Sequence, residues 1–423
     1  MAKKDASHDE ALDQANAADP VLPSPPNDLI VLQQGFARPV TNADDETFLL
    51  YSLSRPEDDR AGLGFVNASS DTLRVTVALR HADGHPEIAV ESIDEEEQMQ
   101  IMSARYKSRS RGKGGASSAR SRKARTSSKD QTPSLAEVGQ VVVAIRQNTT
   151  SLRSTVGDTG SVVWRSSLSL ASLMLRQLLS PSCETSASAP PLLQSHSFQI
   201  ARILELGAGT GVLPLLLLAH PDIAAPNVGT TWIATDQAAM MPLLRRNLDA
   251  HHLSQTKEAN ASTSCNQSSG VRLGSAELDW LEAQQAWESG VESRRQRFRS
   301  AVLSDFVGRS TCHVDKEAQA VEDDAWPDLI LASDCIYNPS LFAALLATID
   351  LFCAPNRTLA LIVCELRSAE TVQLWLSNWL ARGSSEDRGP NTNGKWCICS
   401  LEKEMLGHMM GKGNAAWVAW RTR

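Results

Sequence analysis

The stretch ILELGAGTG, residues 203–211, decides the fold of this chain. It begins as an apolar, buried strand, and a helix is predicted to start at its last glycine. Glycines at positions 207, 209 and 211 separate the two elements. Glycine lets a backbone turn tightly and approach a bound molecule closely. We therefore expect a ligand-binding loop here, with a simple tight turn as the alternative.

The same alternation of strand and helix continues along the chain. Strands are predicted at residues 201–207, 230–236, 271–278, 327–334, 358–366, 396–403 and 415–423, and helices at 168–179, 211–220, 237–251, 340–352 and 370–382. Such alternation is typical of an α/β fold with a mainly parallel sheet. The last two strands are joined by a short glycine-rich segment without a predicted helix, which favours an antiparallel terminal pair.

The spacing of the glycine loop separates two classes of ligand. It is G-x-G-x-G, whereas dinucleotide sites have G-x-G-x-x-G. Glu205 stands two residues before Gly207, and its carboxylate would repel a pyrophosphate but attract a cation. S-adenosylmethionine carries a sulfonium and an ammonium group. We therefore expect S-adenosylmethionine as the ligand, and an NAD-dependent oxidoreductase is the rival interpretation.

Two further carboxylates end predicted strands. Asp236 ends the next strand after that of the glycine loop, where a carboxylate can accept hydrogen bonds from ribose hydroxyls. Its alternative role is to cap the next helix. Asp334 ends a later strand, at the edge where α/β sheets bind ligands. A cap is the alternative here too, but Asn338 and Ser340 lie closer to the following helix. Both aspartates are therefore candidate site residues.

Composition and charge limit the class of protein. With 42% apolar residues, the 423-residue chain can bury a core, and its net charge of −8 gives no general attraction to nucleic acid or anionic membrane. The longest apolar run, residues 212–219, is too short to span a bilayer, and the polar start MAKKDASHDE predicts no signal peptide. The eight cysteines form no C-x-x-C, so we expect no metal site and reduced thiols.

Three regions are predicted along the chain. Residues 1–27 are rich in Ala, Asp, Pro and Ser and are expected to be disordered. Residues 28–137 form a small N-terminal β extension, and residues 138–423 form the α/β domain. Within that domain the polar segments 254–270 and 290–325 are interpreted as surface insertions.

A low-complexity insertion, residues 82–135, interrupts the N-terminal extension. Predicted strands at 73–79 and 141–147 flank it, so it is expected to sit inside a β-hairpin. Its stretch 105–129 is basic and rich in Ser and Gly, and cannot bury a core. Such runs also occur as nuclear-localisation or nucleic-acid-binding segments. Because Tyr106 is the only aromatic residue of that stretch, a solvated surface insertion is favoured.

In chain order, ELGAGTG, TDQ, AELDW and SDCIY resemble the motifs of the seven-stranded (class I) protein lysine methyltransferases. The D-x-x-Y from Asp334 to Tyr337 is the motif that distinguishes that family. The segments TDQ, TGSVVW and GLGFVNASSDTLRVTVA are similar to the fungal ribosomal lysine N-methyltransferase 5 group. The resemblance covers residues 138–423, and 62–80 less closely. It implies a Rossmann-like seven-stranded sheet with an antiparallel C-terminal strand, and makes 138–423 the methyltransferase domain.

The resemblance also implies a site, position by position. Together with Glu205 from the argument above, the cofactor-binding residues are Trp164, Glu205, Gly207, Ala208, Gly209, Asp236, Trp280, Ala332 and Ser333. Asp236 would hold the ribose hydroxyls, and Trp280 would lie beside the adenine. Core packing is the alternative for Trp164 and Trp280. The catalytic residues implied are Asp334 and Tyr337.

The implied function is S-adenosylmethionine-dependent N-methylation of a protein lysine, on a large-subunit ribosomal protein. We expect a cytoplasmic monomer, with the nucleus as the alternative location, and no metal, membrane or direct nucleic-acid partner. Asp334 would raise the pKa of a bound amine, so we predict that it orients the amine and is not its base. Tyr337 would offer its ring or hydroxyl to the ammonium. The alternatives are a non-catalytic cofactor-binding module on ribosomes and a methyltransferase with another acceptor.

Overall fold

The computed structural model describes residues 22–53, 64–79, 87–94, 96–98, 100–101, 139–154, 159–179, 191–225, 228–259, 271–304, 326–382, 394–410 and 413–422. The predictions for residues 1–21 and for the basic stretch 105–129 lie outside these residues. Within the described part of the chain, every helix is too short or too polar to cross a membrane.

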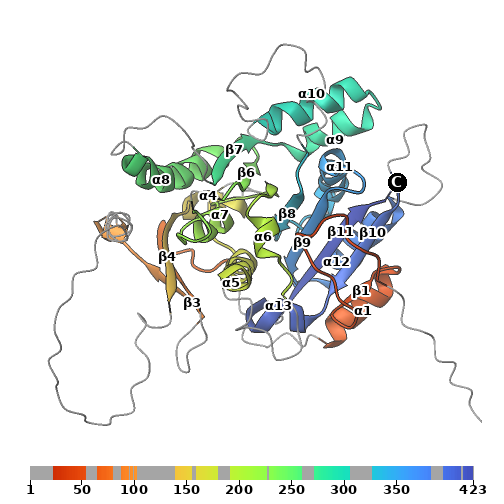
Figure 1. Ribbon diagram of the computed structural model, residues 1–423, viewed down its shortest axis with the longest axis horizontal. Helices are drawn as coiled ribbons and strands as arrows, with labels where there is room; N and C mark the ends of the chain where they lie inside the picture. The colour runs from red at the N-terminus through yellow and green to blue at the C-terminus, as the bar shows by residue number, and fades with distance from the viewer. Residues whose placement is uncertain are drawn as a thin grey trace, which may run out of the picture.

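An eight-stranded sheet forms the centre of the molecule, in the order β1-β10-β11-β9-β8-β5-β6-β7 (Figure 1). Its strands are β1 (Ala37–Pro39), β5 (Arg202–Leu206), β6 (Thr231–Asp236), β7 (Arg272–Glu277), β8 (Leu329–Ser333), β9 (Leu359–Glu365), β10 (Trp396–Leu401) and β11 (Asn414–Arg421). Neighbours from β7 to β9 pair in parallel, whereas β11 is antiparallel to β9 and β10. The predicted Rossmann-like arrangement with an antiparallel C-terminal strand is confirmed, and β1 adds an eighth strand at the edge.

This strand order positions the site. From β5 the chain moves outward to β6 and β7, and then returns to β8 on the other side of β5. Loops that leave the carboxyl ends of β5 and β8 therefore diverge, and a crevice forms at that switch point. The glycine loop follows β5, and Asp334 follows β8. The motifs found in the sequence thus meet at one edge of the sheet.

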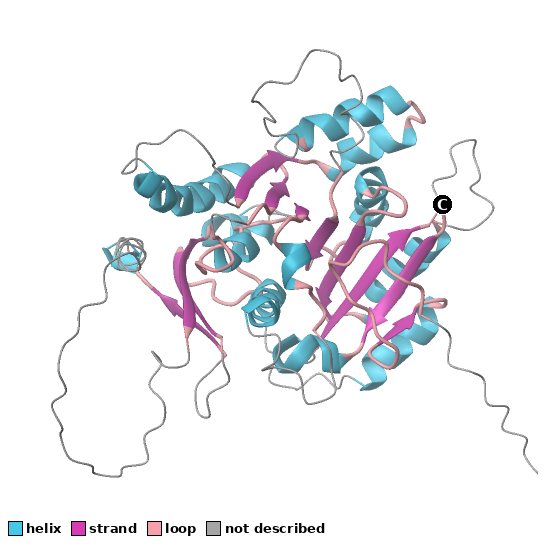
Figure 2. Cartoon of the chain, in the orientation of Figure 1, coloured by secondary structure: helices cyan, strands magenta, loops and turns pink. Residues whose placement is uncertain are grey.

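Helices cover both faces of the sheet (Figure 2). One face packs against α5 (Arg165–Leu179), α7 (Val212–Leu217), α8 (Met241–Ala259) and α13 (Lys403–Met410), and the other against α1 (Ala43–Leu53), α9 (Trp280–Glu288), α10 (Glu292–Val302), α11 (Phe342–Phe352) and α12 (Ala369–Ala381). The short helices are α4 (Thr149–Ser154), α6 (Ser195–Phe198), η2 (Thr159–Ser161) and η5 (Pro339–Leu341). Because both faces are covered, β8 is buried along its whole length.

A second, smaller sheet lies to one side of the main one and has the order β3-β2-β4 (Figure 1). It contains β2 (Thr72–Ala78), β3 (Ile88–Ser92) and β4 (Gln140–Arg146). The predicted pairing of the two flanking strands is confirmed, because β2 is antiparallel to β4. The predicted boundary of the insertion 82–135 is wrong, since β3 lies inside it and pairs with the other edge of β2. Residues of β3 are held by backbone hydrogen bonds to β2, and such bonds cannot be predicted from amino-acid composition.

The disorder predicted for residues 1–27 is wrong for residues 22–27. The side-chain amide of Asn27 donates hydrogen bonds to the carbonyl oxygens of Asp328, at 3.0 Å, and Arg357, at 2.8 Å. Leu22 packs against the core. A few specific contacts therefore hold a segment whose composition is typical of disorder.

Two further elements differ from the prediction. The segment 290–325, interpreted as a surface insertion, contains α10, and its Phe298 lies 6.5 Å from the ring of Phe352 on α11. Helix α13 lies between β10 and β11, where only a glycine-rich turn was expected. It is interrupted at Gly407, which has a φ of 67°.

Candidate active site

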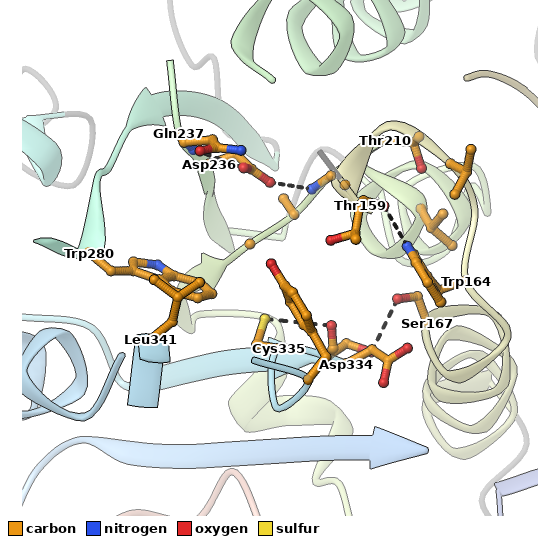
Figure 3. A pocket seen from close by; sticks show the side chains of 18 of the residues that line it. Thr159, Trp164, Ser167, Thr210, Asp236, Gln237, Trp280, Asp334, Cys335 and Leu341 are labelled. Carbon is orange, nitrogen blue, oxygen red and sulfur yellow. Dashed lines mark hydrogen bonds between the residues drawn. The ribbon is translucent and has the colours of Figure 1, made fainter. Parts of the chain in front are cut away.

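A cleft of about 410 Å³ opens at the carboxyl ends of β5, β6 and β8. Figure 3 shows Asp236 and Gln237 on one side of it and Asp334 and Cys335 on the other, with Trp280 and Trp164 at its flanks. The sequence-predicted site residues that line the cleft are Trp164, Gly207, Ala208, Gly209, Asp236, Trp280, Ser333, Asp334 and Tyr337. Glu205 and Ala332 do not belong to the lining.

Two other segments of the chain pack closely against the glycine loop. Gly207 and Gly209 have φ values of 65° and 54°, which an L side chain rarely adopts. A Cβ atom at Gly207 would lie 2.8 Å from the sulfur of Cys335, and one at Gly209 would lie 2.8 Å from the carbonyl oxygen of Gly160. These glycines therefore let two neighbouring segments pack against the loop, and so shape the cleft.

Asp236 joins β6 to that loop. One carboxylate oxygen accepts a hydrogen bond from the backbone amide of Gly209, at 2.7 Å, and the other from the amide of Gln237, at 2.8 Å. The side chain is almost buried but lines the cleft. Helix α8 begins only at Met241, so Asp236 does not cap it. Each carboxylate oxygen can accept a further hydrogen bond, which suits the hydroxyls of a ribose.

The structure corrects the assignment of Glu205 to the cofactor site. Successive side chains of a strand point to opposite faces, and Glu205 points into the core, where the indole nitrogen of Trp232 donates to its carboxylate at 2.9 Å. Burial raises the pKa of Glu205 to about 8, although that hydrogen bond lowers it. The group is therefore protonated at neutral pH and does not offer a charge to a ligand.

Ala332, whose backbone was expected to line the cleft, is the second predicted residue that is absent from the lining. It is fully buried between the sheet and the helices on the α11 side, because β8 is covered on both faces. The last residue of β8, Ser333, does reach the cleft. Its hydroxyl oxygen accepts a hydrogen bond from the hydroxyl group of Ser167, with 3.1 Å between the two oxygens.

Two partly buried tryptophans form walls of the cleft. The indole nitrogen of Trp164 donates to the carbonyl oxygen of Thr159 at 2.8 Å, and the ring of Phe65 packs edge-on against it, with ring centroids 6.3 Å apart. Trp280 is the first residue of α9, which Asp279 caps. Both rings face the cleft, so core packing is not their sole role.

The backbone of Asp334 adopts a left-handed conformation, with a φ of 60°. Its amide donates to the carbonyl oxygen of Val363 at 2.7 Å, and its carboxylate accepts from the amide of Glu365 at 3.3 Å. Both contacts fix the turn to β9. The helix-cap alternative fails for Asp334, because Asn338 accepts from the amide of Ser340 and caps η5.

Asp334 belongs to a cluster of four charged side chains. The guanidinium of Arg367 donates to the carboxylates of Asp334 and Glu365, and Arg165 donates to Glu365 from the other side at 3.0 Å. Arg367 also lies over the ring of Trp164, 4.9 Å from its centroid. Sequence reasoning missed Arg367 as a cleft residue; the signal was CELR, a charged ending to an otherwise apolar strand.

Tyr337 and Cys335 complete this end of the cleft. Burial raises the pKa of Tyr337, and a hydrogen bond with Thr159 opposes that rise, so the phenol is neutral. Burial also raises the pKa of Cys335 well above its ordinary value, and its thiol donates to the carbonyl oxygen of Leu206 at 3.4 Å. The thiol is thus a neutral wall of the cleft and not a nucleophile.

The donor set fits S-adenosylmethionine. A carboxylate stands where ribose hydroxyls are bound in this fold, the glycine loop leaves room beside the strand end, and two aromatic rings flank the cleft. The fold and the cleft are of the type found in class I, S-adenosylmethionine-dependent methyltransferases. Within that class, residues 146–263 and 311–378 match the model of the Methyltransf_16 family, described as lysine methyltransferase. A comparison with curated protein sequences finds no match.

Three solved structures show similarity to parts of the chain. Mitomycin 7-O-methyltransferase MmcR shares 13% identity with it, over 53% of this chain and 50% of that chain, with a TM-score of 0.28. An O-methyltransferase family 2 protein from Planctomyces limnophilus shares 10% identity, over 65% of this chain and 68% of that chain, with a TM-score of 0.26. The pyocyanin biosynthetic protein PhzM shares 14%, over 53% and 51%, with a TM-score of 0.25. The chain thus spans about half the length of MmcR and PhzM.

Proposed function

We propose that this chain is a protein-lysine N-methyltransferase. The observation that carries the proposal is the carboxylate of Asp334 at the cleft, with Trp164 and Tyr337 among the lining residues. A carboxylate and aromatic faces favour a cationic side chain. The match to the lysine methyltransferase family supports lysine as the acceptor.

When bound, S-adenosylmethionine supplies a methyl group activated by a positively charged sulfur. The cleft must present the acceptor amine in its neutral form. A free lysine has a pKa of about 10.4, so deprotonation at pH 7 costs roughly 4–5 kcal/mol. Burial of the amine lowers this cost, whereas Asp334 raises it. Asp334 therefore orients the amine through a hydrogen bond, and the ring of Tyr337 borders its path.

We further propose a large-subunit ribosomal protein as the substrate and the cytoplasm as the place of action. The support is the resemblance of TDQ, TGSVVW and GLGFVNASSDTLRVTVA to the fungal ribosomal lysine methyltransferases. The enzyme would act as a monomer, with the substrate protein as its partner.

Incubation with methyl-labelled S-adenosylmethionine and an extract from cells that lack the enzyme tests the acceptor. The expected result is label on a lysine of a ribosomal protein, identified by mass spectrometry. The Asp334→Asn protein is the matched control and should transfer far less label in the same time. Binding of S-adenosylhomocysteine without any transfer would favour a non-catalytic module, and label on another type of side chain would overturn the lysine assignment.

A further inference from the structure

The charged cluster beside the cleft is balanced. It contains the carboxylates of Asp334 and Glu365 and the guanidiniums of Arg165 and Arg367, so the formal charges cancel. The carboxylate side chains are only 4% and 7% exposed. A buried charge that loses its partner strongly destabilises a protein. Each of the two buried carboxylates therefore needs a cation beside it.

Arg367 occupies the place that an incoming cation needs. It holds the Asp334 carboxylate and lies over the face of Trp164, and these are the two groups that would bind an ammonium. A second cation at Asp334 would be repelled while Arg367 holds that carboxylate. An acceptor must therefore first separate Arg367 from Asp334, so the two compete for one carboxylate.

Arg367 can leave Asp334 without losing all its partners. Its guanidinium also donates to Glu365, at 3.0 Å, and its side chain is 28% exposed at the cleft. The backbone of Gly64 packs directly against the Arg367–Glu365 pair, since a Cβ atom there would collide with both side chains. Gly64 therefore leaves the room that this pair needs.

We propose that Arg367 is an internal pseudo-substrate. Its guanidinium holds the position of the acceptor's ammonium at Asp334, and an acceptor lysine binds by displacing it onto Glu365. Arg367 thereby determines specificity: a free amine must break the Asp334–Arg367 pair unaided, whereas a protein lysine is helped by contacts outside the cleft. This inference rests on the proposed function, and adds a competing group within the acceptor site.

Binding of Nα-acetyl-lysine methylamide to the protein saturated with S-adenosylhomocysteine tests the inference, measured by NMR titration. If the competitor is removed in Arg367→Met, the binding-competent fraction rises, and the affinity for this probe should increase about tenfold. The double variant Asp334→Asn/Arg367→Met should lose that gain. Affinity for S-adenosylhomocysteine, measured by calorimetry, reports that the cofactor site is intact.

Arg165→Met is the matched control. Arg165 pairs with the same Glu365 at the same distance of 3.0 Å but does not line the cleft, so its loss should leave the probe affinity within about twofold. Unchanged or weaker binding in Arg367→Met, or an equal gain in Arg165→Met, overturns the inference. If the Met variant does not fold, Arg367→Gln serves in its place. The proposed function is tested separately, by label transfer to a lysine. Failure of the pseudo-substrate inference can therefore be distinguished from failure of the proposed function.

Discussion

The carboxylate of Asp236 accepts a hydrogen bond from the backbone amide of Gly209, with 2.7 Å between oxygen and nitrogen. This bond links the end of β6 to the loop after β5, and so connects two motifs that are separate in the sequence. Asp236 therefore shapes the glycine loop and also lines the cleft. A substitution at Asp236 therefore affects both the loop and the cleft. Two different replacements are needed to separate these roles.

Asp236→Asn is expected to weaken S-adenosylmethionine binding and to leave the fold intact. The amide oxygen can still accept from Gly209, whereas the bond from the amide of Gln237 and the charged acceptor for the ribose are lost. Hydrogen bonds to a charged group contribute about 1.5–3 kcal/mol, which corresponds to a loss of affinity of roughly 10–150-fold. Asp236→Ala should lose the loop contact as well and lower the melting temperature. Unchanged affinity by calorimetry in a folded Asn variant would contradict the assignment.

Glu205 makes stability depend on pH. Its folded-state pKa is raised from 4.5 to about 8, so between these values the folded protein holds a proton that the unfolded chain has released. Stability therefore falls as the pH rises through this window, by about 1.4 kcal/mol per pH unit for one proton. Glu205→Gln keeps an oxygen for Trp232 but does not titrate. In urea unfolding at pH 5, 6.5 and 8, the free energy of unfolding of the variant should rise relative to that of the wild type as the pH increases. A difference that stays constant over these pH values would refute this.

Sequence patterns predict the sheet and the glycine loop because both depend on local information. Strand periodicity and the glycines at 207 and 209 determine where the strand ends and how the loop turns. The same periodicity does not show where Glu205 points, because both faces of β5 are buried: Ile203 packs in one core cluster and Leu204 and Leu206 in the other. The contact of Glu205 with Trp232 joins two neighbouring strands and requires the tertiary structure.

The charged cluster is different, because it depends on contacts between distant segments. Arg165 and Glu365 are 200 residues apart in the chain, and each alone resembles an ordinary charged residue at the end of an element. Strand β3 is similar, since its pairing with β2 is not visible in its composition. These parts require the tertiary structure.

Deletion of residues 103–136, replaced by a short Gly/Ser linker, should leave the melting temperature and S-adenosylhomocysteine binding unchanged. The reason is compositional, because the segment has few apolar residues to bury. Deletion of 82–135 is the matched comparison. It removes β3 and the buried ion pair between Glu87 and Arg176, and loss of one partner of a buried pair costs about 3–5 kcal/mol. Equal melting temperatures for both deletions would argue against a structural role for β3.

Asp334→Asn is expected to slow methyl transfer strongly and to keep cofactor affinity near that of the wild type. Asn tolerates the left-handed backbone at this position, where φ is 60°, so the turn is preserved while the charge is lost. Loss of a charge-assisted hydrogen bond of about 3 kcal/mol lowers the rate by roughly 100-fold. Single-turnover transfer to the identified protein measures it, with S-adenosylhomocysteine affinity alongside. A folded variant with full activity would remove Asp334 from the mechanism.

Tyr337 provides the finer probe of the acceptor end. Its hydroxyl is hydrogen-bonded with Thr159, so its ring, and not the hydroxyl, is the part available to an ammonium. Tyr337→Phe should therefore keep single-turnover transfer within about tenfold, since the hydrogen bond it loses contributes only about 0.5–1.5 kcal/mol. Tyr337→Ala removes the ring and should weaken acceptor binding while leaving cofactor affinity unchanged. A Phe variant as inactive as the Ala variant would assign the work to the hydroxyl and would require its bond with Thr159 to break when the acceptor binds.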